Sequence, residues 1–236
     1  MERYALQLKI SLVGVKPLIW RRVVVNADIS LGDLHDVIQT VMLWNDTHLH
    51  KFYDKHQTYM MPFDDCEYED QQEQIEAYEE ALVEDILTEK GQHLKYEYDF
   101  GDSWVHDILV EEVLPPIEGH RDAIFIKGKN ATPPEDCGGF WGYERLRKVM
   151  ANPKDPEYDD MAEWLGLFDE ETFDPTDMGC TVDEFNDMLS EDPNYSDEPI
   201  VGDSGLEMLE KVLSDPKLPE EFRDSLMDAL SQLQKK

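Results

Sequence analysis

The sequence predicts an α+β fold with a mixed or antiparallel sheet, and three observations carry this prediction. Apolar and polar residues alternate over residues 4–13, and a second β-type segment, residues 19–25, follows after a turn that contains Gly and Pro. Residues 31–43 change to the helical spacing of apolar residues. Two aromatic-rich segments, 94–100 and 104–114, flank a short polar turn and predict a second hairpin.

The first hairpin and the helix after it form one N-terminal β-hairpin/helix unit. Ser30 is followed three residues later by Asp33, the pattern of a capping box, so the helix is expected to begin at Leu31. A connector leads from this helix to a further predicted strand over residues 48–53. The resulting order, β-β-α-β, is β-grasp-like, an analogy that rests on element order alone.

The second half of the chain completes the sheet and then becomes helical. Residues 124–126 predict one more short strand, and residues 132–143, with two prolines and three glycines, predict a shaped loop without regular structure. C-terminal helices are expected after this loop, one that ends before Pro153 and others over residues 157–165 and 182–189.

A chain of 236 residues with 41% hydrophobic residues is long enough to bury a substantial core. Residues 62–80 are acidic and rich in Gln, which predicts an insertion, and a short helix over residues 81–87 is expected to close it. The composition becomes linker-like after residue 190. We therefore expect an α+β domain over residues 1–190 and a linker with a helical hairpin over residues 191–236.

The formal net charge of −33 restricts the partners of this protein. Proteins that neutralise phosphates gain affinity from Lys and Arg, so direct nucleic-acid binding is not expected. Basic residues are concentrated in the first predicted strands and between Arg121 and Lys154, where a phosphate-bearing ligand would have to dock. Three explanations of the acidity stay open, namely a solvated surface, docking on a basic partner, and binding of divalent cations.

Cysteine usage and the lack of a long apolar segment predict a cytoplasmic protein. The three cysteines are widely spaced and form no C-x-x-C pair, which indicates a reducing cytosol rather than a disulfide framework. The N-terminus runs directly into an alternating pattern, and no segment is apolar for about eighteen residues. We expect neither export nor membrane insertion.

The turn of the second hairpin collects four candidate ligand-binding residues, Asp99, Asp102, Trp104 and His106. In one interpretation, one carboxylate orients His106 and the other meets a ligand, which gives a general base with a pKa near neutral pH. In the other interpretation, Asp102 caps the turn and Asp99 faces water. Gly101 is expected to supply a positive φ to this turn.

The loop rich in Pro and Gly adds Glu135, Asp136 and Cys137 as candidates, because a rigid backbone can hold side chains at fixed geometry. A nucleophilic Cys137 would need a histidine that lowers the pKa of its thiol, and none is adjacent in the sequence. The alternative is a loop that only supports the hairpin.

A metal site is a further hypothesis. His48 and His50 are two residues apart on a predicted strand, so both imidazoles would lie on the same face. Such a pair can chelate a divalent transition metal ion, with His106 or Asp102 completing the coordination. In the alternative interpretations, both histidines bond backbone or carboxylate groups at the edge of a strand, or they take part in acid–base chemistry or ligand contact.

Five short motifs occur together in this chain, over residues 19–22, 34–39, 48–52, 96–106 and 133–139. In this order, over about residues 3–190, they resemble the plasmid Ri ORF-three-like family. Members of that family often carry the label of insertion-element passenger, TnpR-like proteins, so the resemblance implies an association with mobile elements. Thr132 departs from the family pattern, because the loop often begins with a cysteine at that position.

Together these patterns predict an accessory or binding protein that engages a protein or a small-molecule ligand. Two alternatives stay open. One is a metal-dependent hydrolase that uses the histidines and aspartates. The other is an acidic decoy that mimics nucleic acid and blocks a basic protein.

Overall fold

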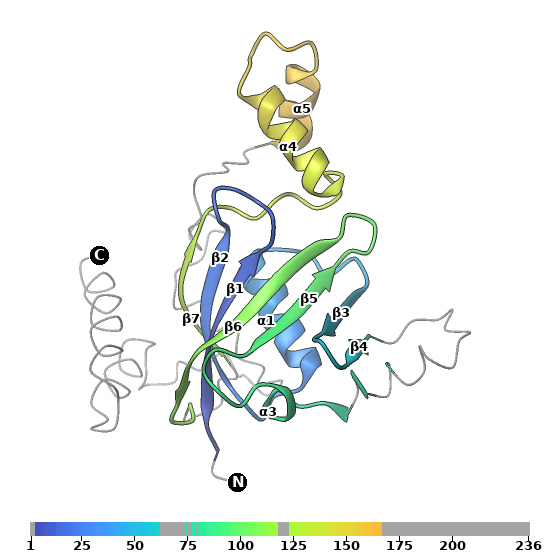
Figure 1. Cartoon of the computed structure of the whole chain (residues 1–236). Helices are drawn as coiled ribbons and strands as arrows, with labels where there is room; N and C mark the ends of the chain where they lie inside the picture. The colour runs from blue at the N-terminus through green and yellow to red at the C-terminus, as the bar shows by residue number, and fades with distance from the viewer. Residues whose placement is uncertain (1–2, 62–73, 75–76, 79, 118–122, 167–236) are drawn as a thin grey trace, which may run out of the picture.

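The structure is a computed structural model that describes residues 3–61, 74, 77–78, 80–117 and 123–166 (Figure 1). Within these residues the elements follow one another as β1 (Ala5–Leu12), β2 (Trp20–Asn26), α1 (Leu31–Met42), β3 (His50–Tyr53), β4 (Thr58–Met60), α3 (Val83–Ile86), β5 (His93–Tyr98), β6 (Trp104–Leu114), β7 (Ala123–Lys129), α4 (Gly139–Met150) and α5 (Tyr158–Leu165).

The described strands form one sheet in the order β4-β3-β5-β6-β1-β2-β7, and every neighbouring pair is antiparallel. The predicted α+β class is therefore confirmed, and the sheet is of the antiparallel type. The β1–β2 hairpin and α1 form the expected N-terminal unit. The β-grasp-like order is not confirmed.

Helix α1 begins with the predicted capping box. The Asp33 backbone N–H donates to Ser30 Oγ (3.0 Å), and the Ser30 backbone N–H donates to Asp33 Oδ2 (2.7 Å). These bonds satisfy backbone donors that the first helical turn leaves without partners. The helix ends where Leu43 adopts a left-handed conformation with φ 63°, which turns the chain toward the connector before β3.

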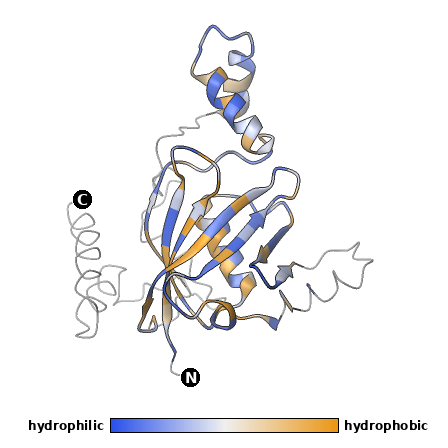
Figure 2. Ribbon diagram, viewed as in Figure 1, coloured by the Kyte–Doolittle hydropathy of each residue, from blue (hydrophilic) through white to orange (hydrophobic). Residues whose placement is uncertain are grey.

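The core lies between α1 and one face of the sheet, and α1 crosses behind the strands in the view of Figure 1. Apolar and polar residues alternate along the strands (Figure 2), which directs the apolar side chains to that face. Leu8, Ile10 and Leu12 of β1 are fully buried. Each such side chain stabilises the fold by roughly 1.5–3 kcal/mol. The opposite face carries cross-strand ion pairs such as Lys95–Asp107, as expected for an antiparallel sheet with one solvated face.

Two local predictions are corrected by the structure, and one short strand, β4, was not predicted. Strand β3 begins at His50, so His48 precedes the strand instead of lying on it. The predicted loop over residues 132–143 is too long, because α4 begins at Gly139. Its prolines lie well before this point, and positive φ values at Gly138 and Gly139 turn the chain into the helix.

The predicted helix over residues 182–189 and the predicted appendage over residues 191–236 lie outside the described residues. The proposed domain boundary therefore stays a prediction. None of the described helices is both long and apolar enough to cross a membrane.

Candidate functional site

Three segments meet at one end of the sheet, namely the connector after α1, the β5–β6 turn and the loop before α4 (Figure 1). Trp44 Nε1 donates to the Pro133 carbonyl (3.1 Å), and the Gly138 backbone N–H donates to Asp102 Oδ2 (3.1 Å). Several predicted site residues lie on these segments: His48, Asp99, Asp102, Glu135, Asp136 and Cys137.

The side chain of Asp99 holds the β5–β6 turn together. Its Oδ1 accepts the backbone N–H groups of Gly101 (2.9 Å) and Asp102 (3.3 Å). The prediction that Gly101 supplies a positive φ is wrong, because Asp99 (φ 56°) and Ser103 (φ 54°) take the left-handed conformation. Aspartate tolerates this conformation when its side chain bonds the local backbone. Asp99 is buried, so the alternative in which it faces water while Asp102 caps the turn is also wrong.

His48 lies against two carboxylates. Its Nε2 is 3.8 Å from Asp99 Oδ2 and 3.4 Å from Asp136 Oδ1. This nitrogen is buried and has no hydrogen-bond partner among the described residues. Two ligand atoms that each lie about 2.1 Å from a tetrahedral metal ion are about 3.4 Å apart, whereas a hydrogen bond holds N and O about 2.9 Å apart. Both distances exceed that of a hydrogen bond, and the 3.4 Å spacing to Asp136 matches two ligands of one ion, whereas the 3.8 Å spacing to Asp99 is somewhat longer.

The residues around His48 hold it in place. Its ring packs edge-on against Tyr98, with ring centroids 5.7 Å apart. The Tyr98 hydroxyl donates to Glu135 Oε1 (2.6 Å) and accepts from the Thr47 backbone N–H (3.0 Å). Burial, and then the hydrogen bond to Glu135, raise the pKa of Tyr98 to about 12. The hydroxyl therefore keeps its proton at neutral pH and bridges the connector to the loop.

The Cys137 thiol is protonated at neutral pH. Burial, followed by the negative charge of Asp102, raises its pKa to about 12. Nucleophilic attack and metal ligation both require the thiolate. This pKa argues against a catalytic thiol and favours the alternative in which the loop supports the hairpin.

Replacing Gly139 with alanine is expected to lower the free energy of unfolding by about 2–4 kcal/mol. Gly139 has a φ of +62°, and a Cβ there would lie 2.5 Å from the Asp102 carbonyl oxygen. Gly91→Ala is the matched control, because Gly91 also has a positive φ but a Cβ there would have no atom within 4 Å. Urea unfolding measures both variants. If both variants lost the same free energy of unfolding, Gly139 would not be required for the close approach of the loop to the turn.

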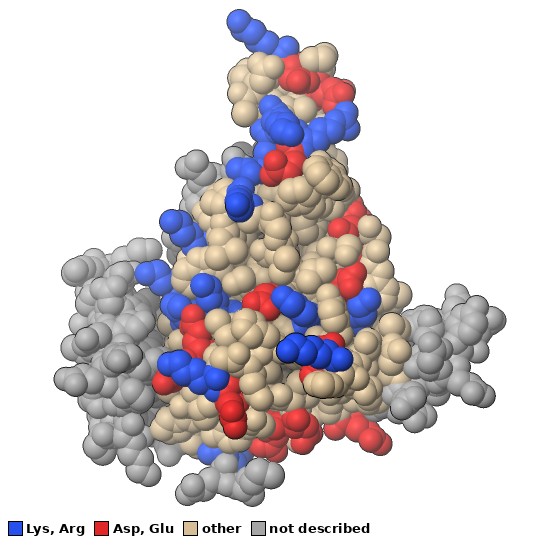
Figure 3. Space-filling model, viewed as in Figure 1, with Lys and Arg blue, Asp and Glu red and all other residues tan. Residues whose placement is uncertain are grey.

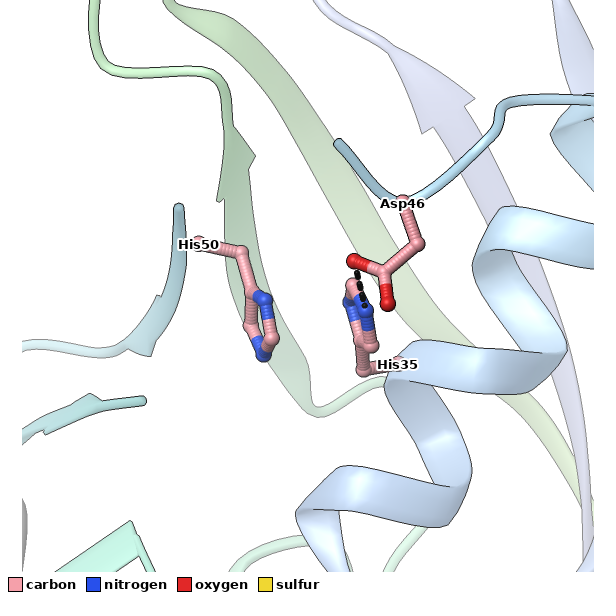
Figure 4. A group of neighbouring side chains, drawn as sticks. All are labelled: His35, Asp46 and His50. Carbon is pink, nitrogen blue, oxygen red and sulfur yellow. Dashed lines mark hydrogen bonds and ion pairs between the residues drawn. The ribbon is translucent and has the colours of Figure 1, made fainter. Parts of the chain in front are cut away.

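His50 lies in a second cluster with His35 and Asp46, in which both histidines are buried and Asp46 is exposed (Figure 4). The two imidazole rings are stacked, with centroids 3.5 Å apart and an interplanar angle of 8°. His35 Nε2 pairs with Asp46 Oδ1 at 2.9 Å, and its Nδ1 contacts the Tyr96 hydroxyl at 2.8 Å. Burial, and then the neighbouring His35, lower the pKa of His50 to about 3. Parallel rings direct their lone pairs side by side and not at one point, which disfavours a metal centre here, although His50 Nδ1 also has no hydrogen-bond partner among the described residues.

His106 and Trp104 are core residues. His106 is fully buried, and its Nδ1 donates to the Trp104 carbonyl (3.1 Å). Its ring contacts Trp44 and Tyr96. No contact with a carboxylate is found for it among the described residues, so neither aspartate of the turn orients it as predicted. The structure also does not bring together the predicted metal set of His48, His50 and His106.

His35 and Asp46 are polar site residues that the sequence analysis did not single out. His35 carries a readable signal, because it lies four residues after Leu31 and three before Ile38, on the apolar stripe of the helix. A polar residue at a buried helical position needs a buried partner. The identity of that partner, Tyr96, depends on sheet packing and has no local signal.

In its described part, the chain is an α+β protein with an antiparallel sheet and a polar site that three connecting segments form at the end of the sheet. The chain belongs to the plasmid pRiA4b ORF-3-like protein family, which it matches over residues 4–177. This finding confirms the family resemblance of the five sequence motifs.

The chain is also similar to two individual proteins. It is 34% identical over 169 residues to the uncharacterized protein y4hQ of Sinorhizobium fredii, which covers 72% of this chain and 84% of that protein. It also resembles the crystal structure of MM3350, a protein of unknown function from Methanosarcina mazei Go1, with 36% identity and a TM-score of 0.64. That similarity covers 75% of this chain and 98% of MM3350.

Proposed function

We propose that this protein is a binding protein that holds a divalent transition metal ion between His48, Asp99 and Asp136. One observation carries the proposal, the buried His48 Nε2 that lacks a hydrogen-bond partner and lies 3.4 and 3.8 Å from two carboxylate oxygens. One imidazole and two carboxylates are ligands that Zn²⁺, Mn²⁺ and Fe²⁺ accept. The bonds from the turn to Asp99 Oδ1 leave Oδ2 directed at His48, which is the outer-shell support that metal ligands commonly have.

The ion would remain accessible to a ligand. The Asp136 side chain is 75% exposed, whereas the side chains of His48 and Asp99 are 25% and 12% exposed. Three protein ligands leave at least one coordination position for water or for an atom of a small molecule or a partner protein. The predicted accessory or binding role thus gains a chemical basis, namely recognition of a ligand that can coordinate the ion.

Metal titration of protein purified without a histidine tag tests the proposal. We expect one Co²⁺ ion per chain, followed by the visible absorption of Co²⁺ and by calorimetry. His48→Ala should lower the affinity roughly 100-fold or more, because it removes the imidazole ligand.

His93→Ala is the matched control. His93 Nδ1 also lies beside a carboxylate, 3.0 Å from Asp107 Oδ2, but it lies on strand β5 away from the proposed centre. This variant should bind Co²⁺ like the parent protein. A parent protein that binds no stoichiometric Co²⁺, or an equal loss in both variants, would contradict the proposed centre.

A metal-dependent hydrolase is the second candidate, favoured by the exposure of Asp136. A metal-bound water in the open position would have a lowered pKa and could attack an ester or phosphoester. Assays of Zn²⁺- and Mn²⁺-loaded protein on activated esters and phosphoesters distinguish the two candidates. Turnover that is lost in His48→Ala but kept in His93→Ala supports the hydrolase, and metal binding without turnover supports the binding protein.

A further inference from the structure

Five residues form what we call the basic patch on the sheet face opposite α1: Lys9, Trp20, Arg22, Lys127 and Lys129. They come from the neighbouring strands β1, β2 and β7. Arg22 is the cross-strand partner of both Lys9 and Lys127, and Trp20 is the partner of Lys129. Basic side chains gather over β2 and β7 in the space-filling view (Figure 3).

Positive charge dominates this patch although the whole chain carries a net charge of −33 and Arg22 pairs with Glu111 (2.8 Å from Nη2 to Oε1). Two cations lie near the Trp20 ring, with Lys9 Nζ 5.3 Å and Arg22 Cζ 5.1 Å from its centroid. Lys127 and Lys129 are exposed and form no ion pair within the described part of the chain. Elsewhere on this face the lysines are neutralised by cross-strand acids, as in Lys51–Glu97 and Lys95–Asp107.

Protection of the sheet edge explains only part of the patch. β7 is an edge strand of the described sheet, and lysines on edge strands discourage pairing with other chains. Lys9 and Trp20, however, lie on the interior strands β1 and β2. The edge therefore does not account for a partly exposed tryptophan beside two cations, which is suited to an acidic partner with an apolar or aromatic component.

The chain itself contains a segment of this chemistry. Residues 167–198 include twelve Asp and Glu residues, no Lys or Arg, and four aromatic residues. This segment starts directly after α5. Helix α4 is joined to the β1–β2 turn by a hydrogen bond from Arg147 Nη1 to the Lys16 carbonyl (2.7 Å), so the attachment point lies at the same end of the sheet as Trp20. An extended chain covers about 3.5 Å per residue, and a tethered segment reaches an effective concentration of about 1 mM.

We propose that the basic patch binds the acidic segment over residues 167–198 of the same chain, with carboxylates paired to Lys127, Lys129 and Lys9 and an aromatic side chain packed near Trp20. Opposite charge and the covalent tether favour this occupant. A nucleic acid would meet the same cations, but it lacks the covalent tether and would be repelled by the net charge of −33 that the whole chain carries. The proposal is independent of the metal centre.

Zero-length carbodiimide cross-linking of the full-length protein tests this inference. The reagent joins an ammonium group to a carboxylate only where the two are in contact, and mass spectrometry identifies the joined peptides. We expect cross-links from Lys127, Lys129 and Lys9 to acids of residues 167–198. They should fall roughly fivefold between about 50 mM and 500 mM NaCl, because salt screens exposed charges. Cross-links from Lys51 and Lys95, which already have acidic partners, provide the internal control.

Two variants and one labelling experiment decide between outcomes. Lys127→Glu/Lys129→Glu should abolish the cross-links from Lys9 to this segment, whereas Lys148→Glu on α4 should leave them unchanged. A mixture of ¹⁴N- and ¹⁵N-labelled chains distinguishes cross-links within one chain from cross-links between two chains. Cross-links within one chain support the proposal, and mixed-isotope cross-links would overturn it in favour of a second copy. If the cross-links to residues 167–198 are absent, the proposal is also overturned. Binding of a fluorescent oligothymidylate at the patch in that case would indicate a nucleic-acid partner instead.

Discussion

Replacing Arg21 with methionine is expected to lower the free energy of unfolding by about 3–5 kcal/mol. Arg21 is fully buried on strand β2. Its Nε donates to the Val41 carbonyl (2.7 Å), and its Nη2 donates to Thr132 Oγ1 (3.0 Å). Its Nη1 donates to three further backbone carbonyls, those of Trp20, Lys129 and Asn130.

The large effect follows from what the substitution leaves behind. Methionine fills much of the volume and removes the cost of burying a charge, but it donates no hydrogen bond. Acceptors from β2, the end of α1 and the segment after β7 would then lose their shared donor, at about 1–3 kcal/mol for each one that stays buried and unpaired. Burial lowers the pKa of Arg21 to about 9, so the guanidinium is still charged and fully donating at neutral pH.

Arg22→Met is the matched control for this prediction. Arg22 neighbours Arg21 but points to the opposite face, where it pairs with Glu111 (2.8 Å from Nη2 to Oε1) and has a side chain that is 21% exposed. A partly exposed ion pair contributes up to about 1 kcal/mol. Urea unfolding followed by far-UV circular dichroism measures both variants. Similar losses for the two would contradict the structural role of Arg21.

Local sequence patterns predicted those elements whose causes are local. The capping box of Ser30 and Asp33 fixes the first turn of α1, so the predicted start at Leu31 is confirmed. Strand β6 has the predicted limits, because an alternating run with aromatic residues begins at Trp104 and ends before two prolines. In both cases the signal and the structure that it specifies lie within a few residues of each other.

The features that the sequence did not predict correctly depend on contacts between residues or segments that local patterns do not reveal. β4 has only three residues, Thr58–Met60, and its pairing with β3 is what defines it. His48 and His50 are two apart in sequence, but the chain enters β3 only at His50, so they serve different clusters. Glycine adopts a positive φ most easily, so Gly101 was expected to do so. Asp99 adopts it instead, because its carboxylate accepts backbone N–H groups of the turn.

The sequence predicted several residues of the candidate site but not how they lie relative to one another. Asp99 and Asp136 were named from turn and loop composition, and His48 from its spacing to another histidine. Their proximity requires the β5–β6 turn and the loop before α4 to approach each other, which the Gly138–Asp102 hydrogen bond records. A contact between residues 36 positions apart has no signature in composition or periodicity.

The buried His106 makes stability depend on pH. Desolvation by burial lowers its pKa to about 3 in the folded protein, whereas the unfolded chain restores an ordinary value of about 6.5. Between these values the unfolded state binds one more proton, so stability is complete above about pH 6.5 and decreases as the pH falls toward 3. At pH 5 this one side chain should cost about 2 kcal/mol relative to pH 7. Burial also lowers the pKa values of His35 and His50, which adds to the loss.

His106→Asn should therefore flatten the dependence of the free energy of unfolding on pH, by about 1.2 kcal/mol per pH unit between pH 5 and 6. The asparagine amide can still donate to the Trp104 carbonyl that accepts from His106 Nδ1, but it does not titrate. Ile108→Val, which trims another fully buried residue of β6, is the control that lowers stability by the same amount at every pH. Urea unfolding at pH 5, 6 and 7 separates the two effects. His106→Asn changes the slope of the free energy of unfolding against pH, whereas Ile108→Val lowers that free energy equally at each pH. An unchanged slope in His106→Asn would mean that this imidazole is not held neutral by the fold.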